Sequence, residues 1–153
     1  MIIIKHRVNT IKELKLINKD YGIEIDLRSN KSDIYLHHDP FKNGESFLEW
    51  VKFYNHRLLV LNVKEEGLEN KIIKILKKYN IKNFFFHDQS FSSIIKNMKK
   101  TNVSIRYSEF EKIYNRNYLF KFIKWVWIDN FNYIPNDNQF YDFLKKKKVM
   151  TCI

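Results

Sequence analysis

Cysteine, proline, glycine and alanine are scarce in this chain of 153 residues, which has one Cys, two Pro, three Gly and no Ala. The single cysteine, Cys152, excludes an intramolecular disulfide framework and a CxxC metal site. No segment approaches the roughly 20 apolar residues of a membrane span, and the N-terminal apolar run is too short for a signal peptide. We therefore expect a protein without transmembrane segments in the reducing cytoplasm.

Linkers and low-complexity tracts are also lacking, so residues 1–153 are predicted to form a single, partial domain. The formal net charge is +11, and most of it comes from lysines spread along the chain. Dispersed lysines usually form a solvated face, and no nucleic-acid-binding motif is present. A nucleic-acid partner is not expected, and a basic nucleic-acid-binding protein is the third of three functional hypotheses.

Short apolar runs alternate with segments of helical periodicity along the chain. Strands are predicted at 2–6, 23–28, 34–38, 58–64, 83–87, 103–107, 125–129 and 149–153. Helices are predicted to begin at the capping signals of Thr10 and Ser46, and to cover 68–79, 91–99, 108–114 and 138–147. Repeated strand–helix units predict an α/β fold with a parallel sheet.

Polar side chains recur at every second position toward the carboxyl ends of several predicted strands. In a closed βα barrel these ends gather at one mouth, where active sites of that fold lie. The pattern therefore favours a functional site at such a mouth, and the alternative is a set of solvated edge and loop residues. No glycine-rich phosphate loop, serine elbow or HExxH motif offers another kind of site.

The polar residues at these strand ends suit metal-assisted phosphate chemistry. Glu24 and Asp26 lie two residues apart on one strand face, a spacing suited to Mg²⁺ or Ca²⁺. His6 and His38 end neighbouring elements and could form an acid/base pair near neutral pH. Four cations near the same mouth could bind a phosphate or instead pair with carboxylates: Arg7, Arg28, Lys64 and Arg106.

Several of these residues form a recognisable order. His6-Arg7 followed by Asn9-Thr10, then Glu24-Ile25-Asp26 after a glycine, then His38-Asp39-Pro40, resembles the glycerophosphodiester phosphodiesterase family. That family belongs to the phosphatidylinositol-phospholipase-C-like TIM barrels. The match is clear over about the first 40 residues and looser at 61–64, 87–88, 106–109 and 125–129.

The resemblance implies a (β/α)8 TIM barrel and cation-dependent hydrolysis of a small glycerophosphodiester. It implies that His6 and His38 are the acid/base pair, that Glu24 and Asp26 are metal ligands, and that Arg7 and Lys64 contact the phosphate. Arg106 is expected to join the substrate-binding cations. Val8 departs from the family's usual glycine, and Asn62 stands where a third acidic metal ligand is usual.

The second functional hypothesis follows from these departures. Asn62 can ligate a hard cation but brings no charge, so the chain could be a catalytically impaired member that binds phosphate or glycan phosphate. The chain of 153 residues is also shorter than a typical TIM barrel, which takes about 250 residues. We expect a barrel incomplete at its C-terminus: a truncated member, one that closes with another chain, or an open sheet. An exposed C-terminal strand edge would favour self-association.

Overall fold

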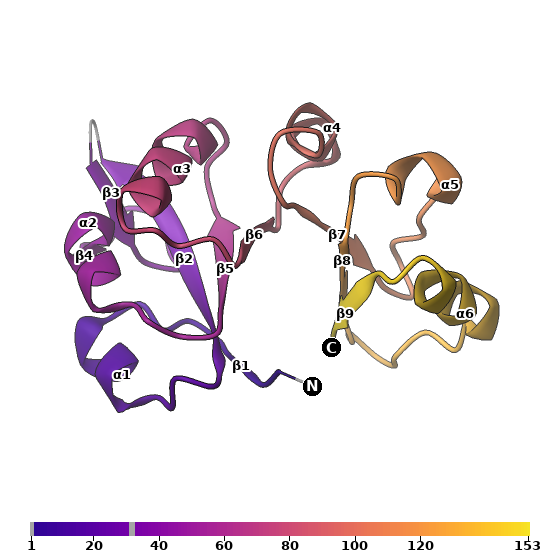
Figure 1. The fold of residues 1–153 in the computed structure, drawn as a ribbon, viewed down its shortest axis with the longest axis horizontal. Coiled ribbons are helices and arrows are strands. Elements are labelled where there is room, and N and C mark those ends of the chain that lie inside the picture. Colours follow the sequence, from indigo (N-terminus) through magenta and orange to yellow (C-terminus); the bar gives the residue numbers. More distant parts are fainter. Residues whose placement is uncertain (1, 31–32) are drawn as a thin grey trace. The chain divides into compact units, whose positions relative to one another are not determined.

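The computed structural model describes residues 2–30 and 33–153, which divide into two compact units, Met1–Gln89 and Ser90–Ile153. Strands and helices alternate along both units, except for three consecutive strands in the first, as Figure 1 shows. The α/β class predicted from the sequence is confirmed. Within the described ranges, no helix is long and apolar enough to cross a membrane.

The first unit is built on a six-stranded mixed sheet with β2 (Gly22–Asn30) at its centre. β2 pairs in parallel with β1 (Ile4–Lys5) along one edge and with β5 (Leu58–Val63) along the other. Its final residues form an antiparallel hairpin with β3 (Asp33–Leu36), which continues to β4 (Glu45–Ser46). β6 (Phe84–His87) adds in parallel to β5.

Helices α1 (Ile11–Leu16), α2 (Phe47–Trp50) and α3 (Glu69–Lys78) lie to the left of β5 in the view of Figure 1. A 3₁₀ turn, η1 (Val51–Phe53), extends α2. One face of β2 supplies core residues with no exposed surface, namely Ile23, Ile25 and Leu27. Burial of such side chains contributes about 1.5–3 kcal/mol each, so this face anchors β2 firmly.

The second unit has a three-stranded parallel sheet in the order β7 (Ser104–Tyr107), β8 (Trp125–Ile128) and β9 (Met150–Cys152). Its helices are α4 (Phe91–Asn97), α5 (Arg116–Leu119) and α6 (Asn138–Lys146). The Asp137 side chain caps α6 by accepting the Phe140 N–H at 2.9 Å. The buried Phe140 ring packs 4.4 Å from the Tyr107 ring, which joins α6 to the sheet.

All eight predicted strands are present, although most are shorter than predicted, and β4 was not predicted. The predicted helix at 108–114 is wrong, because the Ser108 hydroxyl accepts the N–H groups of Phe110 and Glu111 and forms a turn instead. A helix does begin directly after Ser46, as predicted, although the Ser46 side chain makes no capping bond and the residue also ends β4. The Thr10 cap is confirmed, with its hydroxyl accepting the Glu13 N–H at 3.1 Å.

No closed barrel is found among the described residues, whose strands form a six-stranded and a three-stranded sheet, so the predicted incomplete (β/α)8 barrel is not confirmed. The antiparallel pairing of β2 with β3 and of β3 with β4 makes the larger sheet mixed rather than wholly parallel. A single domain, a missing C-terminal portion and self-association through the β9 edge stay predictions.

Gly44 marks a close backbone approach between β3 and the start of β4. A Cβ at this position would lie 2.1 Å from the Leu36 carbonyl oxygen, far inside contact distance. We expect Gly44→Ala to push β4 from β3 and lower the free energy of unfolding by about 1–3 kcal/mol. Urea denaturation followed by circular dichroism measures this, with the exposed neighbour Asn43→Ala as the control. Equal stability of the two variants would contradict the predicted clash.

Candidate active site

The two β2 carboxylates lie inside the protein. Glu24 and Asp26 are 2% and 0% exposed, on the strand face opposite the apolar core residues. Asp26 pairs in register with Asn62 of β5, so these side chains leave neighbouring strands on the same face. The two carboxylates therefore do not lie on a solvated strand face.

The buried carboxylates are held by the segment that follows β1 and by Asn62 of β5. Glu24 Oε2 accepts the Arg7 N–H at 2.6 Å, and the Asn62 side chain also donates to this carboxylate. Asn9 makes two hydrogen bonds with Asp26: its Nδ2 donates to Asp26 Oδ2 at 2.9 Å, and its Oδ1 accepts the Asp26 N–H at 2.9 Å. Two strands and one loop thus fix the acidic pair.

Burial raises the pKa of Glu24 above its usual range, because a carboxylate loses hydration inside the protein. The Arg7 N–H bond opposes this rise in pKa, and the neighbouring Asp26 charge adds to it. Positive charge on His6 would lower the pKa of Glu24, as the smallest of these effects. His6 is exposed and directly follows β1.

His38 lies two residues beyond β3 with its ring between a cation and a carboxylate. Arg7 Nη2 is 3.0 Å from His38 Nε2, and His38 Nδ1 is 2.8 Å from Asp39 Oδ1. A guanidinium can only donate, so Nε2 accepts and Nδ1 carries the proton given to Asp39. This bond lowers the pKa of the Asp39 carboxyl. A neutral imidazole backed by a carboxylate is an arrangement suited to proton transfer.

Arg7 connects the buried carboxylates to His38. Its backbone N–H binds Glu24, its guanidinium binds His38, and its φ of 54° lies in the left-handed region, uncommon for a residue other than glycine. The next residue, Val8, is buried and donates its N–H to the Glu24 carbonyl at 2.9 Å. The structure therefore brings together Arg7, Glu24, Asp26 and His38, while the place of His6 beside them stays a prediction.

The predicted cations have different surroundings. Lys64 Nζ lies 3.3 Å from Asp26 Oδ1 and 3.4 Å from Asp88 Oδ2, so it is beside the acidic pair. Arg28, for which a phosphate contact and a carboxylate pair were both open, lies 3.8 Å from Glu65 Oε1 and donates to the His38 carbonyl oxygen. Arg106 belongs to the second unit, where its Nε lies 2.9 Å from Asp129 Oδ2; its contact with substrate stays a prediction.

The donor atoms fit a hard divalent cation. Asp26 Oδ1 and Asn62 Oδ1 are buried and have no hydrogen-bond partner, and Glu24 adds a further carboxylate. Oxygen atoms of this kind are the usual ligands of Mg²⁺ and Ca²⁺. No group of three or more His, Cys, Asp or Glu side chains in the described residues is arranged to hold a metal ion. The set is thus two carboxylates and an amide, with Lys64 as a neighbouring charge.

Three residues of this site were not predicted: Asn9, Asp39 and Asp88. An acidic residue directly after His38 is a signal that could have indicated a histidine–carboxylate pair. Asp88 follows β6 at the same strand end as the other polar groups, which is also a usable signal. Asn9 lies in a loop, where periodicity carries no information about side-chain direction.

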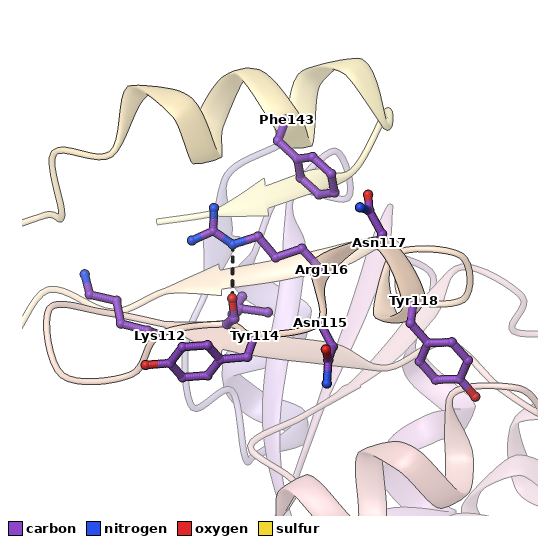
Figure 2. A pocket seen from close by; sticks show the side chains of 8 residues that line it. Lys112, Tyr114, Asn115, Arg116, Asn117, Tyr118 and Phe143 are labelled. Atoms are coloured by element: carbon purple, nitrogen blue, oxygen red, sulfur yellow. Dashed lines mark hydrogen bonds between the residues drawn. The ribbon is translucent and has the colours of Figure 1, made fainter.

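The second unit contains a cavity of about 760 Å³ lined by residues 112–118 and Phe143 of α6. Figure 2 shows Arg116 in this cavity, with its Nε donating to the Ile113 carbonyl at 3.0 Å. Arg116 also lies over the Phe140 ring and 3.6 Å from Asp137. The Arg116 guanidinium therefore makes its contacts within the second unit. None of the predicted site residues lines this cavity.

Solved structures of other proteins share this fold. A protein described as a glycerophosphoryl diester phosphodiesterase from Agrobacterium tumefaciens matches 97% of this chain and 82% of its own, with a TM-score of 0.69 and 12% identity. A glycerophosphoryl diester phosphodiesterase from Parabacteroides distasonis matches 98% of this chain and 70% of its own, with a TM-score of 0.64 and 14% identity. No protein-family model and no curated protein matches the sequence. The family resemblance is therefore confirmed at the level of the fold.

Proposed function

We propose that this chain is a divalent-cation-dependent phosphodiesterase that hydrolyses a glycerophosphodiester-like substrate. The observation that carries the proposal is the buried pair Glu24 and Asp26 beside the unpartnered Asn62 oxygen, with the His38–Asp39 pair linked to it through Arg7. A buried acidic pair is unfavourable for folding alone, which supports a functional reason for it. The shared fold of the two phosphodiesterases supports the reaction class.

The binding roles follow from the donor atoms. Glu24, Asp26 and Asn62 would hold Mg²⁺ or Ca²⁺, which supplies positive charge opposite the phosphoryl oxygens. Arg7 and Lys64 bind the remaining phosphate oxygens. When Arg7 turns to the phosphate it leaves His38 Nε2, whose lone pair then faces the reacting group.

The two imidazoles divide the proton transfers. His38 is neutral, so its Nε2 accepts the proton of the attacking hydroxyl or water, while Asp39 stabilises the imidazolium that forms. His6 protonates the leaving alcohol. Its side chain is exposed and therefore accessible to a substrate.

The second candidate is a catalytically impaired protein that binds phosphate or glycan phosphate. Two observations favour it: Asn62 supplies no charge, and Lys64 Nζ lies 3.3 Å from Asp26 Oδ1, near the position that a cation would take. An ammonium group beside the carboxylate competes with a divalent ion. The two candidates differ in turnover and in their need for the cation.

A hydrolysis assay separates these candidates. The chain, freed of metal with EDTA, is expected to cleave a glycerophosphodiester only after Mg²⁺ or Ca²⁺ is added. Asn62→Asp is expected to tighten cation binding by about tenfold, because it adds a charged ligand. Isothermal titration with each ion measures that affinity. Phosphate binding without turnover in either protein would favour the impaired candidate.

A further inference from the structure

Arg28 lies on β2 two residues beyond Asp26, yet its guanidinium binds the main chain of another segment. Its Nε and Nη2 donate to the His38 carbonyl oxygen at 3.2 and 2.8 Å. The Arg28 side chain is only 13% exposed, so these bonds are largely shielded from water. Two charge-assisted donors on one carbonyl hold the His38 backbone in place.

Glu65 holds Arg28 from the other side. It lies just beyond β5, and its Oε1 is 3.8 Å from Arg28 Nη1. Its Oε2 accepts both the N–H and the hydroxyl hydrogen of Ser29, so the carboxylate is itself fixed. The ends of three strands, β2, β3 and β5, are thereby connected through one guanidinium.

We propose that Arg28, supported by Glu65, is a positioning residue for His38 in the phosphodiesterase reaction. The proposal rests on the function proposed above. His38 lies beyond the last paired residue of β3; the His37 N–H still donates to the Asp26 carbonyl oxygen at 3.2 Å, and the Arg28 bonds hold the carbonyl oxygen of the next residue, His38. The Arg28 bonds set where the imidazole stands relative to Arg7 and Asp39. Displacement of a reacting group by about 1 Å is enough to lower a rate by about a hundredfold.

The first test does not depend on activity. In ¹⁵N-labelled protein, Arg28→Ala is expected to shift the amide signals of residues 37–39 and to increase their mobility in ¹⁵N relaxation. Arg57→Ala is the matched control, because Arg57 is an exposed arginine of the same unit. Unchanged shifts and relaxation at residues 37–39 in Arg28→Ala would overturn the positioning role.

The second test asks whether Arg28 acts through His38. Arg28→Ala is expected to lower kcat by about 30- to 100-fold with KM and cation affinity little changed, and Arg28→Lys to recover part of this loss. The double variant Arg28→Ala/His38→Ala should be no slower than His38→Ala alone. Independent losses that multiply, or a loss of cation affinity, would overturn the proposal. A wild-type chain without turnover would instead refute the proposed function. The amide shifts and relaxation of residues 37–39 would then still show whether Arg28 holds the His38 backbone.

Discussion

His38→Ala is expected to lower kcat for a glycerophosphodiester by about 10²- to 10⁴-fold, the usual contribution of a general acid or base. The ring has a proton-accepting Nε2 toward Arg7 and a carboxylate behind its Nδ1. Alanine removes both properties while leaving the Glu24 and Asp26 contacts in place. Steady-state kinetics at saturating Mg²⁺ measures the loss, and His6→Ala is expected to show one of similar size.

A control variant keeps this result specific. His56→Ala removes another histidine of the first unit, one whose Nε2 lies 3.2 Å from the Ile17 carbonyl oxygen rather than at the acidic pair. It should retain activity near that of the wild type under conditions where it is folded. Full activity of His38→Ala would refute the role assigned to this imidazole.

Glu24→Gln is expected to stabilise the fold at neutral pH while abolishing cation-dependent turnover. Burial raises the pKa of Glu24 in the folded state, so its ionisation opposes folding. Removing an incompletely compensated buried charge should raise the free energy of unfolding by on the order of 1 kcal/mol. The amide can still accept the Arg7 N–H, and its NH₂ can donate to the unpartnered Asn62 oxygen.

The pH dependence has a defined sign. Because the folded pKa of Glu24 exceeds its unfolded value, the stability gained from the protonated group is complete below the unfolded pKa and is lost as pH rises through the folded pKa. The advantage of Glu24→Gln should therefore grow over that interval. Urea unfolding between pH 4 and 8 in EDTA measures it, since bound cation would stabilise the wild type. A variant less stable than the wild type throughout, or one that keeps cation-dependent activity, would contradict the account.

The acidic pair could be predicted from the sequence because its signal is local. Glu24 and Asp26 alternate with Ile23, Ile25 and Leu27, and this period of two places charge on one face of a strand and core on the other. Asn62 was likewise predictable, because parallel strands of similar length bring their carboxyl ends to one edge. Register and burial then confirmed the placement of these side chains.

The other contacts of the site depend on the conformation of loops and turns, which the sequence pattern does not reveal. Contact between Arg7 and His38 requires a left-handed φ at Arg7 and a turn after β3, and neither leaves a periodic signal. The strand position of Arg28 allowed either a phosphate contact or a carboxylate pair, and it could not show that the side chain reaches the His38 carbonyl oxygen. Strand β4 has two residues and depends on pairing with Tyr35 and Leu36, so composition could not indicate it.

An amide NMR titration with Mg²⁺ and Ca²⁺ tests most directly whether Glu24, Asp26 and Asn62 form a cation site. Saturable shifts centred on residues 24–26 and 62 are predicted for the wild type, and they should be lost in Asp26→Asn. No saturable shift at these residues, or the same shifts in Asp26→Asn, would contradict the account.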